Sequence, residues 1–203
     1  MPVISAYSEA LRVFRGRKPE EMAVNSGAEF DEKGNRFHLT YFGHDVDVDY
    51  PSGQIRCNIL PELNVNDRVL ILQYLFSSCG TPPRDSWLSF IQLPDGPHHH
   101  APFVVEAITP LAAEFGGRPG ELMEQAAVFG AEKIMMGDYG VRVPAFSHLP
   151  LAVCIWEGDE EFPANANILF DVTAPLHLTT AALWVLGVEL SRKLRGITGQ
   201  QYS

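Results

Sequence analysis

The sequence predicts an α+β protein with a mainly antiparallel sheet, β-hairpins, a central buried helix and a long C-terminal helix. Strand-like segments do not alternate with helices in a βαβ rhythm, which favours this class over a parallel sheet. Arg36–Tyr41 and residues 45–50 alternate in the manner of strands and are joined by the tight turn Phe42–His44. The apolar residues of the segment 66–78 cover nearly its whole circumference, as in a buried helix.

The N-terminal segment, residues 1–27, is predicted to be helical. Its first helix has apolar residues at helical spacing, namely Ile4, Tyr7, Leu11 and Phe14. Pro19 opens a short second helix, which Gly27 ends. A chain of 203 residues fits one domain, so we expect this segment to be part of a single domain whose main body is residues 28–203.

The middle of the chain contains the predicted central helix. A short strand is expected at residues 54–59, and Asn64 or Asn66 can cap the helix that follows. A further strand is expected at residues 87–93, with a Pro-Asp-Gly-Pro turn at residues 94–97.

Prolines mark the helices of the second half. Pro102 is expected to start a helix that Pro110 must break or kink, because an internal proline removes a backbone hydrogen bond. Pro119 starts another helix, and Gly130 ends it.

The last third of the chain predicts the centre of a sheet and the C-terminal helix. Leu149–Trp156 is entirely apolar, so it is expected to be a central strand, with residues 167–171 extending the same region. The final helix spans residues 179–195, and its apolar residues recur at three- and four-residue steps: Leu183, Leu186, Leu190, Leu194 and Ile197.

Composition and charge narrow the class of protein. Apolar residues make up 46% and charged residues 20%, the proportions of an ordinary globular protein. The formal net charge is −10, from 15 Lys and Arg against 25 Asp and Glu. Such a charge repels nucleic-acid phosphates and anionic membrane surfaces, so we expect neither as a partner.

The cysteines and the termini favour a cytoplasmic protein. Cys57, Cys79 and Cys154 include no CxxC pair, which argues against a disulfide framework, a zinc ribbon or an iron–sulfur cluster held by this chain. The first residues lack the apolar core of a signal peptide, and no apolar run reaches the roughly 20 residues that span a bilayer. P-loop, dinucleotide-binding, zincin and nucleophile-elbow motifs are also absent from the sequence.

A run of three histidines follows the turn at residues 94–97. Imidazole nitrogens suit zinc, copper, nickel or iron. In an extended segment His98 and His100 point the same way and His99 points opposite, so His98 and His100 are candidate metal ligands. A third ligand would have to come from elsewhere. The alternative is a polar loop whose histidines contact solvent or cap the helix expected at Pro102.

A group of carboxylates follows the apolar strand. Its members, with one more acid at the end of the next apolar run, are Glu157, Asp159, Glu160, Glu161 and Asp171. Clustered carboxylates suit hard cations or general acid–base chemistry. If the two strands are neighbours, Asp159 and Asp171 converge on a ligand or on a positively charged partner. The alternative is a turn whose acids accept hydrogen bonds from backbone amides.

The tryptophans complete the candidate ligand-binding residues. Trp87, Trp156 and Trp184 are interpreted as core residues, yet a Trp beside a charged loop often forms the wall of a pocket. We therefore expect a pocket between residues 156–171 and residues 87–100. Its candidate ligand-binding residues are Trp87, Trp156, Asp159, Glu160, Glu161 and Asp171.

An ordered series of short motifs is similar to a known family. The motifs are Trp87-Leu88-Ser89-Phe90, Leu93-Pro94-Asp95-Gly96, Phe115-Gly116, Gly137-Asp138, Leu149-Pro150-Leu151, Trp156-Glu157-Gly158-Asp159-Glu160-Glu161-Phe162-Pro163 and Ile168-Leu169-Phe170-Asp171. In this order they resemble the prokaryotic family called domain of unknown function 3786, from about Pro19 to the final helix. The resemblance carries no settled activity. It implies an anaerobic bacterial or archaeal setting.

The resemblance also implies a class of partner. Some relatives look like fusions to a cysteine-rich iron–sulfur domain similar to that of corrinoid-linked methyl-transfer proteins. This chain lacks those cysteines, so a cluster would belong to an iron–sulfur or corrinoid protein partner.

Three hypotheses about function follow. The leading one is an accessory protein that binds a small ligand or cofactor of unknown identity. The second is a metal-dependent enzyme that uses the histidines and carboxylates. The third is an interaction module that docks on an iron–sulfur or corrinoid protein. A large apolar pocket with few polar groups would favour the first, and a cleft with converging His and Asp would favour the second.

Overall fold

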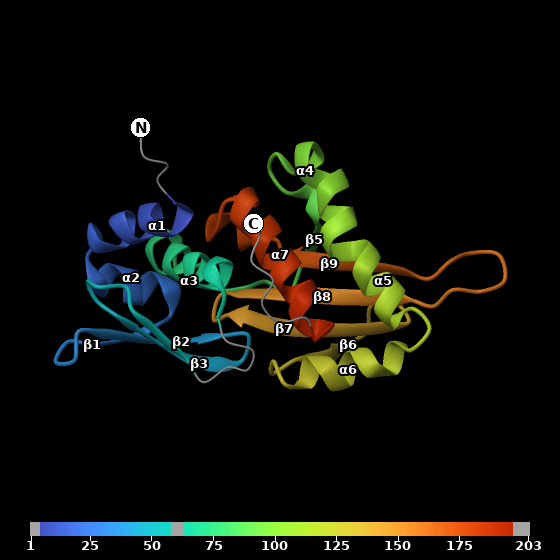
Figure 1. Ribbon diagram of the computed structural model, residues 1–203, viewed down its shortest axis with the longest axis horizontal. Coiled ribbons are helices and arrows are strands. Elements are labelled where there is room, and N and C mark those ends of the chain that lie inside the picture. Colours follow the sequence, from blue (N-terminus) through green and yellow to red (C-terminus); the bar gives the residue numbers. More distant parts are fainter. Residues whose placement is uncertain (1–4, 58–62, 197–203) are drawn as a thin grey trace.

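The computed structural model describes residues 5–57 and 63–196, which form two antiparallel sheets with helices packed on them (Figure 1). The predicted α+β class, the antiparallel pairing and the long C-terminal helix are confirmed. Ile4, Ile197 and the last two residues of the strand expected at residues 54–59 lie outside the described residues. Within the described ranges, no helix has the length and apolar character required to cross a bilayer.

The first sheet comes from the N-terminal third of the chain. Its strands, in spatial order, are β1 (Glu29–Asp31), β2 (Arg36–Tyr41), β3 (His44–Asp49) and β4 (Ile55–Cys57). The predicted hairpin of β2 and β3 is confirmed. Its turn residues Phe42 and Gly43 have φ of 46° and 73°, the left-handed conformation of two-residue hairpin loops.

Three helices lie over one face of this sheet: α1 (Ala6–Arg15), α2 (Pro19–Ser26) and α3 (Val65–Ser77) (Figure 1). Asn64 caps α3 by accepting a hydrogen bond from the amide of Asp67, whose carboxylate accepts one from the amide of Asn64. The sequence left Asn64 and Asn66 as alternatives, and Asn64 is the cap. The buried residues of α3 include Leu70, Ile71, Leu72, Tyr74 and Leu75. The prediction of a central buried helix is therefore confirmed, although Val65 and Ser77 at its ends are exposed.

The second sheet forms the larger part of the molecule. Its strands, in spatial order, are β5 (Trp87–Ser89), β9 (Asn165–Asp171), β8 (Leu149–Trp156), β7 (Tyr139–Phe146) and β6 (Glu132–Ile134). The central position predicted for β8 is confirmed. A hydrogen bond of 3.0 Å from the amide of Phe42 to the carbonyl of Ala145 links the two sheets.

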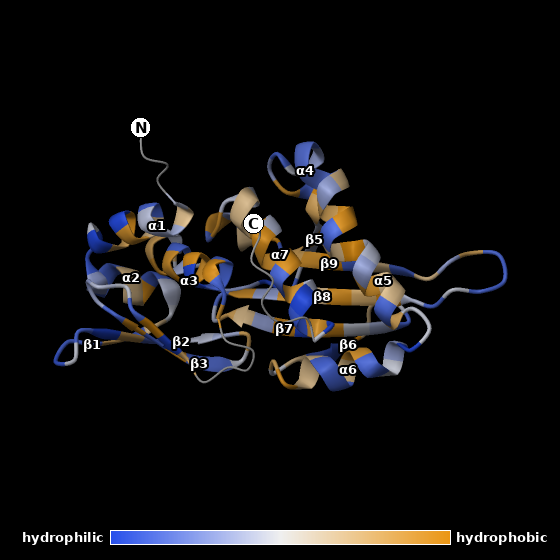
Figure 2. Cartoon of the chain, viewed as in Figure 1, coloured by the Kyte–Doolittle hydropathy of each residue, from blue (hydrophilic) through white to orange (hydrophobic). Residues whose placement is uncertain are grey.

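One face of the second sheet is covered by α4 (Gly96–Phe103), η2 (Val104–Ile108), α5 (Thr109–Phe115) and α7 (Thr180–Leu194) (Figure 1). The helix α6 (Pro119–Ala127) packs against β7. Helix α7 packs against α3 and against η2. Hydrophobic residues are concentrated on α7 and on the central strands beneath it (Figure 2). Helix α7 thus joins the two halves of the core.

The helix around Pro102 differs from the prediction. It begins at Gly96 and has Pro97 in its first turn. Proline is well accommodated there, because the amides of the first turn have no partner within the helix and the missing N–H of proline costs no hydrogen bond. The expectation that Pro102 starts the helix is therefore wrong, since Pro102 lies inside α4. Pro110 does interrupt the α-helix, as predicted: the five residues before Thr109 form the π-helical segment η2.

The strand expected at residues 87–93 is also shorter than predicted. It ends at Ser89, and residues Phe90–Gln92 form the 3₁₀ turn η1. The side chain of Gln92 accepts a hydrogen bond of 2.8 Å from the amide of Ser89, which stabilises this turn.

Candidate functional site

The acidic turn predicted from the sequence is a loop, residues 157–164, that projects from the end of β8 and β9 (Figure 1). Oδ1 of Asp159 accepts hydrogen bonds from the amides of Glu161 (2.8 Å) and Phe162 (2.7 Å). These amides hold the pKa of Asp159 below its ordinary value. Glu160 and Glu161 are exposed. The alternative interpretation, a turn whose acid bonds backbone amides, therefore describes Asp159.

Asp171 lies at the opposite end of the same pair of strands. Trp156 pairs with Asn165 beside the projecting loop, whereas Phe170 pairs with Leu151. Six residues at about 3.3 Å each separate Asp171 from the loop end by roughly 20 Å. The expected convergence of Asp159 and Asp171 is wrong, because the two strands form a hairpin. Asp159 lies in the loop that joins the strands, and Asp171 lies at the open end of the hairpin.

Asp171 is fully buried and its carboxylate is occupied by local groups. It accepts hydrogen bonds from the amide of Arg84 (3.0 Å) and from the amide (2.9 Å) and hydroxyl (2.7 Å) of Thr173. Trp87 is its cross-strand partner and is half-buried. Because Trp156 lies at the far end of β8, Trp87 and Trp156 cannot line one pocket, and that part of the prediction is wrong.

The histidine run lies in α4 and not in an extended loop. Successive residues of an α-helix are about 100° apart, so His98 and His100 point in nearly opposite directions. The expectation that they share a face is therefore wrong. No group of three or more His, Cys, Asp or Glu side chains that could hold a metal ion occurs among the described residues.

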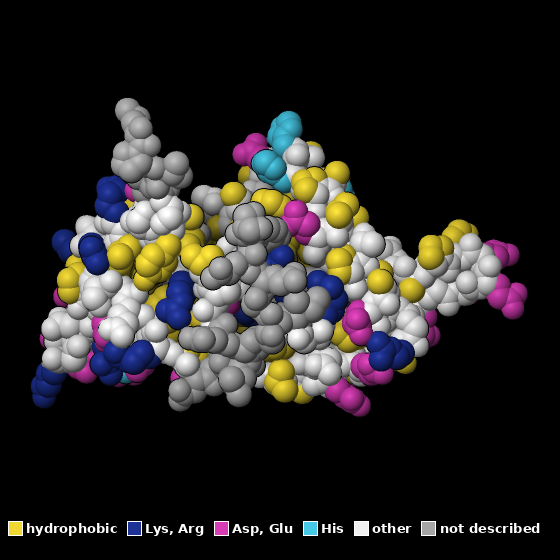
Figure 3. All heavy atoms as spheres, viewed as in Figure 1, with side chains coloured by type: hydrophobic (Ala, Val, Ile, Leu, Met, Phe, Trp, Pro, Cys, Tyr) yellow, Lys and Arg dark blue, Asp and Glu magenta, His cyan; other side chains and the backbone are white. Residues whose placement is uncertain are grey.

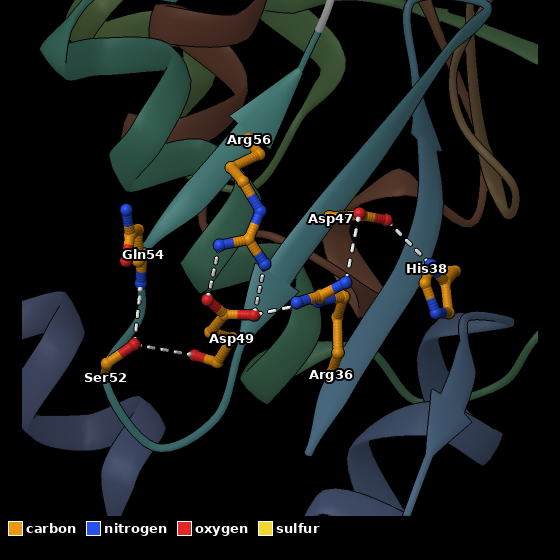
Figure 4. A network of polar contacts seen from close by, with 7 residues as sticks. All are labelled: Arg36, His38, Asp47, Asp49, Ser52, Gln54 and Arg56. Carbon is orange, nitrogen blue, oxygen red and sulfur yellow. Dashed lines mark hydrogen bonds and ion pairs between the residues drawn. The ribbon is translucent and has the colours of Figure 1, made fainter. Parts of the chain in front are cut away.

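A polar network covers part of the outer face of the first sheet (Figure 4). Asp49 accepts hydrogen bonds from Arg36 (2.8 Å) and Arg56 (2.7 Å), and these guanidinium groups, Arg56 first, lower the pKa of Asp49. Nδ1 of His38 lies 2.7 Å from Asp47. A groove of about 560 Å³ runs beside His38 and Asp47. The charged groups of the network are paired with one another across the strands, which stabilises the sheet.

The site with the strongest features for binding is an apolar cavity of about 160 Å³ where α7, α3 and η2 meet. Its walls are Trp184, Val185 and Val188 of α7, Asn66 of α3 and Glu106 of η2. Nε1 of Trp184 is buried and has no hydrogen-bond partner in the part of the chain that the structure describes. The indole N–H can only donate, so a buried donor without an acceptor belongs to a residue of the cavity wall.

A second cavity of about 200 Å³ adjoins the first, because Asn66 and Val185 line both. Its other lining residues come from α3, α7 and the N-terminus of α1: Ala6, Val69, Leu70, Gln73, Thr179, Ala181 and Ala182. The two cavities together reach the lower limit of ordinary ligand sites, about 300 Å³.

Buried polar contacts fix the cavity wall between α3 and α7. The side-chain amide nitrogens (Nδ2) of Asn64 and Asn66 each donate a hydrogen bond of 2.8 Å to the carboxylate of Glu189, which is 1% exposed. Arg192 lies 3.4 Å from the same carboxylate. Asn66 is therefore held in one orientation at the boundary of the two cavities.

A second buried contact joins α3 to the next turn of α7. Nζ of Lys193 is 2.8 Å from Asp67, and the hydroxyl of Tyr41 donates a hydrogen bond of 2.7 Å to the same carboxylate. Burial, followed by the charge of Asp67, raises the pKa of Tyr41 well above its ordinary value. Removing one member of such a group would leave an unpaired buried charge, which is strongly destabilising.

The third wall of the cavity is the wide turn η2. The amide of Thr109 bonds to the carbonyl of Val104, five residues earlier, which is the π-helical pattern. The hydroxyl of Ser191 donates a hydrogen bond of 2.8 Å to the carbonyl of Ala107 and ties the turn to α7. Single π-helical turns inside α-helices are frequent at functional sites.

The sequence interpretation missed this site. The sequence places Trp184 in the core, and its apolar neighbours along the chain give no sign that its N–H lacks an acceptor. The signal that could have directed attention here is the spacing of Pro102 and Pro110, because it predicts a distorted helix at the residues that include Glu106.

The fold and the site thus define an α+β protein with a small apolar cavity beside a distorted helix. The family described as Domain of unknown function (DUF3786) matches residues 18–193, and the chain belongs to this family. Neither the curated proteins nor the solved structures contain a significant match to the chain.

Proposed function

We propose that this protein is an accessory protein that binds a small, largely apolar molecule in the cavities beside Trp184. The observation that carries the proposal is the buried Trp184 N–H without an acceptor in the described residues. An unsatisfied buried donor costs about 1–3 kcal/mol, and a ligand that presents an acceptor recovers that cost. The cytoplasmic location expected from the sequence and the anaerobic setting implied by the family resemblance are part of the proposal.

The size of the first cavity limits the ligand. An enclosed cavity of about 150 Å³ in another protein holds benzene, and the pocket here, which is partly open to solvent, is about 160 Å³. A single ring or a branched chain of similar volume therefore fits. A longer ligand would extend past Asn66 and Val185 into the second cavity.

The charge of the site selects among ligands of that size. Glu106 lines the first cavity, and Glu189 lies behind Asn66. A ligand carboxylate would be desolvated beside these carboxylates, which is unfavourable. A neutral acceptor, such as an amide, a ketone or a ring nitrogen, satisfies the Trp184 N–H without that penalty.

Thermal unfolding in the presence of two probe compounds tests the proposal. Benzamide carries a neutral acceptor and benzoate is its anionic counterpart. Benzamide should raise the unfolding temperature in proportion to its saturation of the site, with a dissociation constant of roughly millimolar for so small a ligand. Benzoate should have a smaller effect.

Matched variants make that test specific. Val185→Phe fills the wall shared by both cavities and should abolish the effect of benzamide. Val24→Phe places the same side chain on an exposed position of α2 and should leave the effect unchanged. No shift with benzamide, or an equal shift in the Val185 variant, would contradict the proposal.

A second candidate function, docking on another protein, is favoured by the exposed apolar side chains at the far end of the second sheet. Trp156 is 39% exposed and Phe162 is 67% exposed. The projecting loop carries apolar and acidic side chains together (Figure 3). A partner with an apolar slot edged by basic residues would fit it, and the family resemblance suggests an iron–sulfur or corrinoid protein.

The docking function has its own test. Co-purification of an iron–sulfur or corrinoid protein under anaerobic conditions should be lost when Trp156 and Phe162 are both changed to Ser, and kept in Val24→Ser. Loss in both variants, or in neither, would count against docking through the loop. A metal-dependent enzyme that uses the acidic loop and the histidine run has less support, because those groups lie apart.

A further inference from the structure

A buried cluster joins the helices of the first sheet to the second sheet, and two histidines lie in it. His148 lies in the turn between β7 and β8, and His177 follows the 3₁₀ turn η3 (Ala174–Leu176). The centres of the two imidazole rings are 5.9 Å apart. His177 is 1% exposed, and Nδ1 of each ring is buried without a hydrogen-bond partner among residues 5–57 and 63–196.

Hydrogen bonds through this cluster connect the two halves of the fold. The amide of His148 donates a hydrogen bond of 3.0 Å to the hydroxyl of Tyr74 on α3. That hydroxyl donates one of 2.8 Å to the carbonyl of Ser26, the last residue of α2. The hydroxyl of Ser77, at the end of α3, donates one of 2.6 Å to the carbonyl of His177. The end of α3 is therefore bonded to the second half of the chain at both histidines.

The tautomer of His177 follows from its ring hydrogen bond. Nε2 lies 3.0 Å from the backbone carbonyl of Thr81. A carbonyl oxygen only accepts, so in the neutral ring Nε2 carries the proton and Nδ1 carries the lone pair. A proton added to Nδ1 would create a buried charged donor, and this nitrogen has no partner in the part of the chain that the structure describes. Such a group is costly to bury, so the junction fits the neutral ring.

Other titratable groups surround His177. They are Tyr74 on α3, Cys79 in the segment after α3, His148 in the β7–β8 turn and Asp171 at the end of β9. Burial lowers the pKa of His177 below its ordinary 6.5, and His148 acts in the same direction. The Thr81 carbonyl and the charge of Asp171 oppose this shift without cancelling it. The carboxylate of Asp171 is already engaged by the amides of Arg84 and Thr173.

We propose that His177 is an acid-sensitive switch, whose protonation releases the end of α3 and the β7–β8 turn from each other while each sheet keeps its own hydrogen bonds. The opened junction binds more protons than the closed one, because the pKa of His177 is lower in the closed form. The closed form is thus most stable above the unfolded pKa of about 6.5 and loses stability as the pH falls through that value toward the folded pKa. The switch does not depend on ligand binding beside Trp184.

The first test is an NMR titration of the ring signals of all seven histidines in the full, unmodified chain. His177 should titrate below pH 6.5 and below His99, which is exposed on α4. This measurement needs no variant, so a folding defect cannot obscure it. A midpoint for His177 at or above that of His99 would overturn the proposal, because it would show that the closed junction accommodates the charged ring.

Hydrogen exchange tests the opening itself. The reporters are the amide of His148 and the amide of Gly80, which donates 2.8 Å to the carbonyl of Asn25. After correction for the intrinsic rate, their opening should rise about fivefold or more between about pH 7.5 and about pH 5.5. The amide of Gly116 at the end of α5 is the control and should not change. An equal rise at Gly116, or no rise at the two reporters, would contradict the switch.

Matched variants assign the response to one ring. His177→Gln keeps a neutral N–H donor for the Thr81 carbonyl and cannot be protonated in this range, so it should abolish the pH dependence at the reporter amides. His99→Gln makes the same change at an exposed position and should keep it. Retention of the pH dependence in His177→Gln, or its loss in both variants, would overturn the assignment to His177.

Discussion

The hydroxyl of Ser191, on α7, donates a buried hydrogen bond of 2.8 Å to the carbonyl of Ala107, in the π-helical turn η2. This bond joins two of the three walls of the cavity beside Trp184. It also supplies a partner for a buried carbonyl within a distorted stretch of helix.

Ser191→Ala should lower the free energy of unfolding by about 1–3 kcal/mol, because it leaves the Ala107 carbonyl without its partner in a buried position. Denaturant unfolding measures the change. Ser147→Ala, at an exposed position, should stay within about 0.5 kcal/mol of the unmodified chain. Equal stability of the two variants would show that the bond contributes nothing.

Gly187→Ala should also destabilise the protein. A Cβ at Gly187 would lie 2.7 Å from the ring of Phe103, which packs between α4 and α7. Overpacking of this kind costs typically about 1–3 kcal/mol. Gly120→Ala in α6 is the matched control, since its Cβ meets nothing within 4 Å and alanine favours a helix by roughly 0.5–1 kcal/mol. Thermal unfolding should therefore move in opposite directions for the two variants.

Asp159→Ala should loosen the projecting loop without affecting the cavities. The amides of Glu161 and Phe162 lose their shared acceptor, so their hydrogen exchange should accelerate. Asp159→Asn keeps an acceptor oxygen and should preserve most of the protection. If Asp159→Ala weakened benzamide binding, the proposed separation of the loop from the ligand site would be wrong.

The titration of Asp49 should report the network on the first sheet. Arg56 and Arg36 hold its pKa below the ordinary 3.8, so the carboxylate stays charged to lower pH in the folded state than in the unfolded state. Its stabilising contribution is present above the unfolded pKa and is lost as the pH falls through the folded pKa. The carboxyl carbon signal of Asp49 should titrate below pH 3.8, and Arg56→Gln should raise that midpoint. An unchanged midpoint would contradict the pairing.

Much of the fold was predictable because local chemistry decides it. Alternating residues around Phe42 and Gly43 predicted the first hairpin, and the all-apolar β8 predicted a central strand. The start of α4 was not predictable from the same rules. The turn residues around Gly96 also suit the first turn of a helix, where a proline loses no hydrogen bond.

The candidate site was less predictable, because it depends on strand register and on tertiary packing. Neighbouring strands were expected to bring Asp159 and Asp171 together, but an antiparallel hairpin places them at opposite ends. The Trp184 N–H lacks a partner only because α3, α7 and η2 meet around it. No local pattern around Trp184 encodes that arrangement.

The most direct test of the central claim is the NMR signal of the Trp184 indole N–H, assigned by its loss in Trp184→Phe, during a titration with benzamide. The account predicts a saturable downfield shift of this signal as the N–H gains an acceptor, with the indole signals of Trp87 and Trp156 unchanged. A Trp184 signal that does not move in the folded protein, or three indole signals that move together, would contradict ligand binding at this cavity.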